Sequence, residues 1–230
     1  MNESLQTVYS AGSGVALQQR NRVLRNTYWL LALSLLPTVL GAWIGVSTGV
    51  VAGMGVGMSA IVFLAGAFGF IFAIEKTKDS AAGVAVLLGF TFFMGLMLSR
   101  LLAAVLGFRN GTSLIMTAFG GTAGVFLAMA MLASVIKRDL SNMGKFLFVG
   151  AVMLLVAGII NIFVQSSALM LTISVIAIGL FTAFLLYDIK RIIDGGETNY
   201  ISATLAIYLD LYNIFQSLLA LLGFAGGERE

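Results

Sequence analysis

The chain has 230 residues, of which 60% are hydrophobic and 10% are charged, and its formal net charge is +3. Soluble domains carry about 25% charged residues, so this composition predicts a protein that crosses the lipid bilayer several times. The sequence contains neither cysteine nor histidine, which excludes disulfides, thiol nucleophiles, serine–histidine catalysis and histidine metal sites. The basic residues are scattered at the ends of apolar stretches, so nucleic acid is not an expected partner.

The apolar residues fall into seven stretches, each with the roughly twenty residues that a helix needs to cross a bilayer. We therefore expect an all-α bundle of seven transmembrane helices. Its predicted parts are a polar cytoplasmic segment over residues 1–26, a membrane domain over residues 27–224 and a short tail over residues 225–230. The predicted spans are Thr27–Val46, Val50–Ile74, Ala81–Leu106, Thr112–Ile136, Phe146–Val164, Ala168–Ile193 and Tyr200–Phe224.

The first span has a competing interpretation as a cleaved signal peptide. The polar segment before it is long, the apolar stretch has the length of a full span, and no small-x-small cleavage site follows it, so a signal peptide fits poorly. Pro37 lies in the middle of this span and is expected to kink it. Glycines recur every fourth residue over Gly49–Gly57, a spacing that lets membrane helices approach closely, and the same packing role is expected for Gly120–Gly124.

The distribution of basic residues predicts the orientation of the chain in the membrane. With the N-terminus in the cytoplasm, the inner segments hold ten basic residues and the outer segments hold three, which agrees with the positive-inside rule. A re-entrant final hairpin would instead leave both termini inside. The inner residues are Arg20, Arg22, Arg25, Lys76, Lys78, Lys137, Arg138, Lys145, Lys190 and Arg191, and the outer ones are Arg100, Arg109 and Arg229.

Two acids lie within the last two predicted spans. Asp188 is about six residues before the turn at Gly195–Asn199, and Asp210 is about eleven residues after it. In an antiparallel hairpin the two carboxyl groups would lie at similar depth, with an offset of roughly 6–8 Å at 1.5 Å per residue. An ionisable group inside a bilayer is costly and indicates a functional site.

Two carboxyl groups within reach of each other are expected to share a proton and to titrate as a unit. Such a pair is a pH sensor without histidine, and it also supplies part of a site for a hard cation such as calcium. Calcium would be a transported or transiently bound ion, and no resident cofactor is expected. The alternative is that Asp188 is solvated at the interface and pairs with Lys190 or Arg191.

A stripe of small and polar residues continues the helical face of Asp210. Ala206, Asn213 and Ser217 follow at i−4, i+3 and i+7, and they line a pathway or form hydrogen bonds with neighbouring helices. We favour the pathway.

Three tyrosines and one arginine complete the candidate residues. Tyr187, Tyr208 and Tyr212 are placed to form hydrogen bonds with the acids or to anchor the helices at the interface. Arg100 ends one apolar run and begins another. Its side chain faces a polar interior or, more commonly for such residues, extends to the outer interface.

Two motifs carry a resemblance to a known family. Leu186-Tyr187-Asp188, together with Ala206-Ile207-Tyr208-Leu209-Asp210-Leu211-Tyr212-Asn213-Ile214-Phe215, resembles the transmembrane Bax inhibitor motif family. Two further segments, 23–28 and 195–201, resemble its bacterial inner-membrane branch, which includes a modulator of the FtsH protease. The resemblance implies a bundle in which the seventh helix is surrounded by the other six. It also implies a pH-sensitive calcium leak in which Asp188 and Asp210 are sensor and gate.

Three functions are compatible with these features. The first is a pH-gated calcium leak in the bacterial inner membrane, and the second is a protein that binds and modulates FtsH, with residues 1–26 as a contact. The third is an intramembrane aspartyl protease. Such enzymes carry a Gly-x-Gly-Asp motif and a Pro-Ala-Leu element, whereas here the second acid follows Tyr208-Leu209 and the single proline is Pro37. We therefore do not expect an enzyme.

Overall fold

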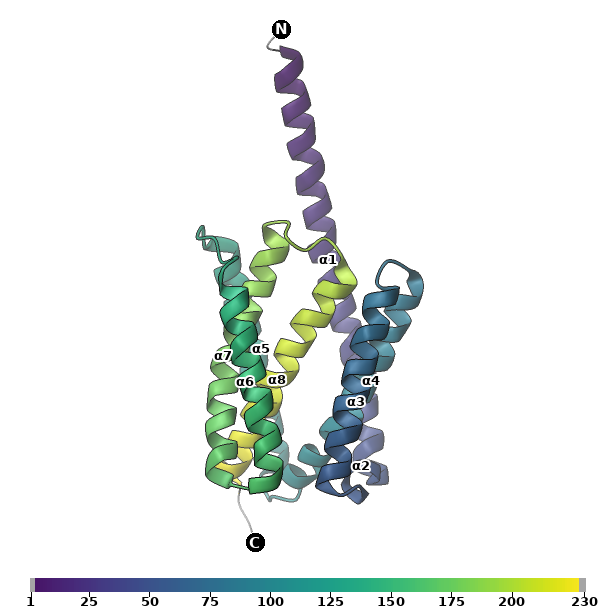
Figure 1. Cartoon of the computed structure of the whole chain (residues 1–230), viewed down its shortest axis with the longest axis vertical. Coiled ribbons are helices and arrows are strands. Elements are labelled where there is room, and N and C mark those ends of the chain that lie inside the picture. The colour runs from purple at the N-terminus through teal and green to yellow at the C-terminus, as the bar shows by residue number, and fades with distance from the viewer. Residues whose placement is uncertain (1–2, 228–230) are drawn as a thin grey trace.

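The computed structural model describes residues 3–227, with side chains from residue 18 onward, and all regular structure in that range is α-helical (Figure 1). All the described helices except α2 are long and apolar enough to cross a membrane, which makes seven candidate spans and confirms the predicted fold class. Parts of the predicted N-terminal segment and C-terminal tail (residues 1–2 and 228–230) lie outside the described residues. The helices are α1 (Glu3–Thr48), α2 (Val50–Gly53), α3 (Val56–Thr77), α4 (Ala81–Leu106), α5 (Gly111–Val135), α6 (Met143–Val164), α7 (Ser167–Ile193) and α8 (Tyr200–Gly226).

The first two spans differ from their predicted limits. Helix α1 is continuous from Glu3 to Thr48 through Pro37, and it extends well beyond the end of the bundle (Figure 1). The second span begins at Val56, because Gly49 has a left-handed φ of 65° and ends the preceding helix. The short helix α2 fills the gap. Gly49 and Gly55 therefore precede the starts of α2 and α3, and Gly57 already belongs to the first turn of α3.

The close helix packing occurs between α1 and α4. A Cβ atom added at Gly41 would overlap the carbonyl oxygen of Phe92, and one added at Gly95 would overlap the carbonyl oxygen of Thr38. The two backbones thus touch where each helix carries glycine, as small residues permit in membranes. The prediction for Gly49–Gly57 and Gly120–Gly124 was wrong, because added Cβ atoms at most of these glycines would meet nothing within 4 Å.

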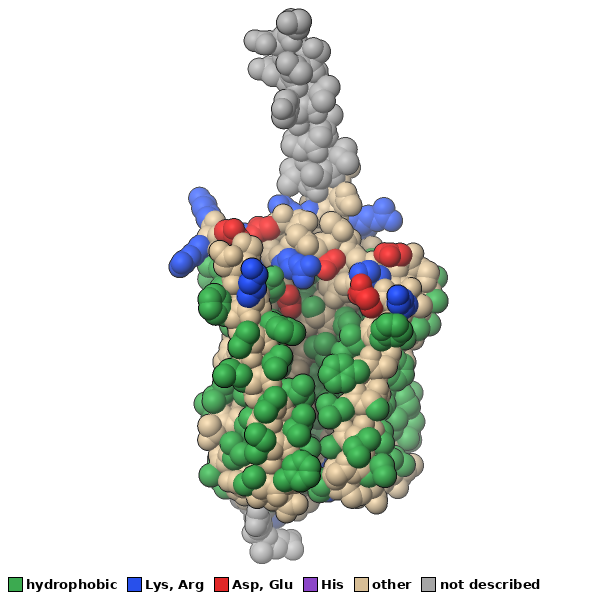
Figure 2. Space-filling model, viewed as in Figure 1, with side chains coloured by type: hydrophobic (Ala, Val, Ile, Leu, Met, Phe, Trp, Pro, Cys, Tyr) green, Lys and Arg blue, Asp and Glu red, His purple; other side chains and the backbone are tan. Residues whose placement is uncertain are grey.

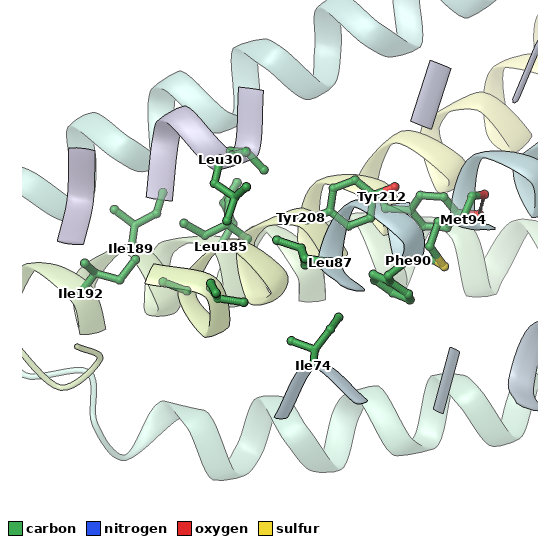
Figure 3. Packing of buried hydrophobic residues seen from close by; sticks show 14 of the residues in the cluster. Leu30, Ile74, Leu87, Phe90, Met94, Leu185, Ile189, Ile192, Tyr208 and Tyr212 are labelled. Atoms are coloured by element: carbon green, nitrogen blue, oxygen red, sulfur yellow. Dashed lines mark hydrogen bonds between the residues drawn. The ribbon is translucent and has the colours of Figure 1, made fainter. Parts of the chain in front are cut away.

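Helix α8 lies at the centre of the bundle. It packs against α1, α3, α4, α5 and α7, whereas α6 packs chiefly on α7 and covers the outside. The central position agrees with the expectation, although α8 has five main neighbours instead of six. The core around it is apolar and comes mostly from α4, α7 and α8 (Figure 3). Its fully buried side chains include Ile74, Leu87, Phe90, Met94, Leu185, Ile189, Ile192, Ile207 and Ile214.

The charged side chains gather at one end of the bundle. Figure 2 shows Lys, Arg, Asp and Glu at the end from which α1 extends, while the sides of the bundle carry apolar residues. The exposed apolar side chains include Trp29, Trp43, Phe146, Phe163 and Val135, and exposure of so many large apolar groups requires lipid around them. We call the end that holds the α7–α8 turn the charged end. The positive-inside rule predicts that it faces the cytoplasm.

One asparagine joins two turns at the charged end. The Asn199 Oδ1 atom accepts hydrogen bonds from the backbone N–H groups of Ile201 and Ser202, at 2.9 and 3.1 Å, and so caps α8. Its Nδ2 atom donates to the Lys78 carbonyl oxygen at 3.0 Å and to Asp79 Oδ1 at 2.9 Å, in the turn between α3 and α4.

We expect Asn199→Ala to lower the free energy of unfolding by about 1–2 kcal/mol, because it removes a helix cap and the link between the turns. Unfolding in mixed micelles, followed by circular dichroism, measures this change. Asn142→Ala is the matched control, because Asn142 stands at the N-cap of α6 without a side-chain capping bond. Equal losses in the two variants would contradict the role assigned to Asn199.

Candidate functional site: a buried aspartate pair between α7 and α8

The structure brings Asp188 of α7 and Asp210 of α8 together. Helices α7 and α8 run antiparallel on either side of the turn at residues 194–199, so the residues that flank the turn lie at the same end of the bundle. The two carboxyl groups lie within hydrogen-bonding reach of each other. Asp210 is 4% exposed, and its Oδ2 atom is buried and forms no hydrogen bond with any described residue. Asp188 is half-buried.

Every other acid whose side chain is described has a cationic or hydrogen-bonding partner from the polar turns. Asp139, for example, accepts hydrogen bonds from the backbone N–H of Ser141 at 2.8 Å and from its hydroxyl group at 3.0 Å. These bonds hold the pKa of Asp139 below its usual range. The other pairs are Glu75 with Lys78, Asp79 with Asn199, Asp194 with Lys190 and Glu197 with Arg191. The aspartate pair differs because each carboxyl group has the other as its neighbour.

The basic residues next to Asp188 in sequence pair with other acids. Lys190 Nζ lies 2.5 Å from Asp194 Oδ1, and Arg191 Nη2 lies 3.6 Å from Glu197 Oε2. The alternative in which Lys190 or Arg191 neutralises Asp188 therefore finds no ion pair among the described side chains. The positive charge of Arg191 still acts on Asp188 through space.

A cavity of about 160 Å³ lies beside the pair at the charged end of the bundle. Asp188, Arg191 and Glu197 line it together with Ser202, Ala203 and Ala206. Ala206 therefore lies where the sequence placed it, on the face that leads to the acids. Arg191 and Glu197 were not predicted as part of the site. Their sequence positions point to a solvated turn, and only the fold of that turn brings them over Asp188.

The tyrosines have partners other than the acids. The hydroxyl groups of Tyr208 and Thr38 share a hydrogen bond of 2.9 Å, and the Tyr208 hydroxyl also donates to the Thr91 carbonyl oxygen at 3.4 Å. The Tyr212 hydroxyl donates to the Met94 carbonyl oxygen at 3.3 Å (Figure 3). Tyr187 packs against Gly144 of α6. Tyr208 and Tyr212 thus attach α8 to α1 and α4.

Among the described side chains, none of the remaining predicted residues forms a hydrogen bond with the pair. Asn213 donates to the Leu209 carbonyl oxygen of its own helix at 2.7 Å, and Ser217 is half-buried. Arg100 lines a second cavity, of about 420 Å³, near the other end of the bundle, and α8 contributes Tyr212 and Gln216 to its wall. Sequence reasoning missed Gln216. Its spacing of four residues from Tyr212 was an available signal.

The pair offers few ligands for a metal ion. Within residues 18–227 no group of three or more acids is close enough to hold one, and calcium takes six to eight oxygen ligands. A calcium ion at Asp188 and Asp210 would therefore keep most of its water molecules. The donor set fits an ion in passage better than a resident ion.

The fold and the pair define a class of protein, a seven-span helical membrane protein with facing acids on its last two helices. The sequence model of the family described as "Inhibitor of apoptosis-promoting Bax1" matches residues 20–227. The chain belongs to this Bax inhibitor family.

Bacterial relatives match over nearly the whole chain. A Vibrio cholerae protein described as an uncharacterized membrane protein is 39% identical over 209 residues, which are 89% of this chain and 90% of the relative. An Escherichia coli K12 protein named "Modulator of FtsH protease YccA" is 38% identical over 221 residues, 96% and 98% of the two chains. Its counterpart in another E. coli strain, named "Inner membrane protein YccA", matches equally.

Proposed function

We propose that this protein is a pH-sensitive calcium leak of the bacterial inner membrane, with its N-terminus in the cytoplasm, in which Asp188 and Asp210 are the sensor and the gate. The observation that carries the proposal is the contact between two carboxyl groups inside the bundle, one of them with a buried oxygen that has no other described partner. Two acids so placed retain a proton more readily than they bear two charges.

In this proposal the structure represents the closed state, in which no continuous path for an ion joins the two cavities. The cavity that contains Asp188 and Ala206 is also lined by Arg191 and Glu197 of the charged end, and the second cavity includes Tyr212, two residues beyond Asp210. The two cavities share no lining residue, and Asp210, which lies on α8 between Ala206 of the first and Tyr212 of the second, is itself buried. A hydrated ion cannot pass from one cavity to the other without a movement of the helices. The shared proton, as a hydrogen bond between α7 and α8, holds them together.

Loss of that proton opens the route. Two carboxylates about 4 Å apart repel each other by roughly 4 kcal/mol at an effective dielectric constant near 20. The repulsion separates α7 from α8, and the two charges then attract a divalent cation. Flux should therefore rise as the pH rises through the titration of the pair. Arg191 and Glu197 also face Asp188, and their paired charges largely offset each other.

Calcium uptake into proteoliposomes tests the proposal. We expect purified protein to admit calcium to vesicles loaded with a fluorescent indicator about tenfold faster at about pH 8 than at about pH 6, which is the effect of roughly 1.4 kcal/mol on the opening equilibrium. Protein-free vesicles correct for passive permeability. Uptake equal to that of protein-free vesicles at both pH values would reject the leak.

A second candidate is modulation of the FtsH protease by direct contact. It is favoured by the name of the E. coli relative and by the extension of α1 beyond the bundle (Figure 1). If contact is the function, FtsH should co-purify with the full-length chain and not with a variant that lacks residues 1–17. Asp188→Asn and Asp210→Asn should bind like the wild type. Binding that survives the truncation would place the contact elsewhere.

A further inference from the structure

The cavity around Arg100 has a composition unlike that of the aspartate site. It has a volume of about 420 Å³, within the range of about 300–1,000 Å³ typical of small-molecule sites. Apolar side chains such as Phe63 and Leu101 form most of its wall. The polar side chains that line it are those of Ser59, Arg100, Tyr212 and Gln216. The hydroxyl groups of Ser59 and Tyr212 already donate to the backbone carbonyl oxygens of Val56 and Met94, so Arg100 and Gln216 are the side chains that can donate to a ligand. No acid lines the cavity.

No ion pair joins Arg100 to an acid within residues 18–227. Its Nη1 atom donates to the Met54 carbonyl oxygen at 3.1 Å and to Ser59 Oγ at 3.4 Å. The guanidinium group carries five N–H donors, so several are left for a ligand. A partly buried cation of this kind favours an anionic oxygen ligand, to which arginine binds in a bidentate manner.

The position of the cavity indicates where the ligand comes from. Arg100 lies six residues before the end of α4 at Leu106, about 9 Å at 1.5 Å per residue, so it is close to one membrane interface. Val56 and Ala104 line the cavity and are exposed. In a bilayer, exposed residues this close to the end of a span lie at the depth where lipid headgroups and acyl chains meet.

We propose that this cavity binds an anionic phospholipid, with the phosphate on Arg100 and the upper part of an acyl chain against the apolar wall. A ligand with an anionic headgroup and a hydrocarbon tail fits this cavity. The headgroup pairs with the arginine that has no counter-ion, and the tail packs against the apolar wall. The bound phosphate neutralises the one charged side chain of the cavity. The proposal does not depend on the calcium leak.

Native mass spectrometry of the full chain in detergent tests it, with phosphatidylglycerol and phosphatidylcholine titrated in parallel. We expect the wild type to retain phosphatidylglycerol at least about tenfold more strongly than phosphatidylcholine, and Arg100→Gln to lose this preference. Arg109→Gln is the control, because Arg109 is an exposed basic residue near the same end of the bundle. Inorganic phosphate should not compete, because it lacks the acyl chain.

A second variant tests the same cavity without changing the arginine, in case Arg100→Gln is unstable. Ala104→Phe fills part of the cavity and leaves the arginine in place, so it should also weaken phosphatidylglycerol binding, whereas Ala104→Ser should not. Equal retention of the two lipids by the wild type, or unchanged retention by both Arg100→Gln and Ala104→Phe, would overturn the proposal. Competition by inorganic phosphate would show a simple anion site instead of a lipid site.

Discussion

Replacing Asp210 with asparagine should abolish the pH dependence of calcium uptake. The amide cannot ionise, and its N–H group can donate to Asp188 as a protonated carboxyl group does. The repulsion of roughly 4 kcal/mol that opens the route is then absent at every pH. We expect uptake by Asp210→Asn at about pH 8 to fall at least tenfold, to about the level that the wild type shows at about pH 6.

Asp194→Asn is the matched control for this experiment. Asp194 lies at the end of α7, is paired with Lys190 and is largely exposed, so its loss changes the local charge by the same amount without touching the pair. Its pH profile should equal that of the wild type. The proposed gate would be disproved by an Asp210→Asn variant with the wild-type profile. Asp188→Asn should behave like Asp210→Asn, because the proposed sensor is the pair and not either residue alone.

Replacing Gly95 with alanine should destabilise the bundle strongly. The added methyl group would lie 2.0 Å from the Thr38 carbonyl oxygen in α1, and a backbone atom cannot turn aside as a side chain can. Overpacking costs about 1–3 kcal/mol, and we expect a loss near about 3 kcal/mol because the two helices must separate along their whole contact. Thermal unfolding in detergent, followed by circular dichroism, measures the change.

Gly124→Ala is the control, because a Cβ atom added at Gly124 in the middle of α5 would meet nothing within 4 Å. Glycine in a helix is less favourable than alanine by about 1 kcal/mol, so this variant should be as stable as the wild type or slightly more stable. A Gly95→Ala variant that unfolds at the wild-type temperature would show that α1 and α4 are not held at the distance the structure gives them.

The sequence predicted the spans and the meeting of Asp188 with Asp210 for a simple reason. Span length is fixed by bilayer thickness, and a short turn between two helices leaves antiparallel packing as the direct solution. Residues at similar distance from the turn then lie at similar depth. The central position of α8 came from the family resemblance and not from periodicity, because apolar residues surround nearly every helix of such a chain.

Other features depend on how each helix is rotated about its axis, which the sequence did not reveal. Gly41 and Gly95 lie at the α1–α4 contact, while the more regular glycines at 49–57 lie around the break between α1 and α3. Gly41 and Gly45 have the same four-residue spacing as Gly49, Gly53 and Gly57. Tyr208 and Tyr212 were likewise expected to bond the acids or to anchor the helices at the interface, but their hydroxyl groups bond residues of α1 and α4. Lipid and protein neighbours are equally apolar, so hydrophobic patterns do not separate them.

The glycine contact between α1 and α4 limits which helices of the bundle can move. Two helices whose backbones touch cannot slide or rotate against each other without collision, so α1 and α4 form one rigid unit. Hydrogen bonds attach α8 to these two helices. Tyr208 bonds Thr38 of α1 and Thr91 of α4, and Tyr212 bonds Met94 of α4. Any opening movement is then expected to displace α7, together with α6 that rests on it, and to leave Asp210 in place.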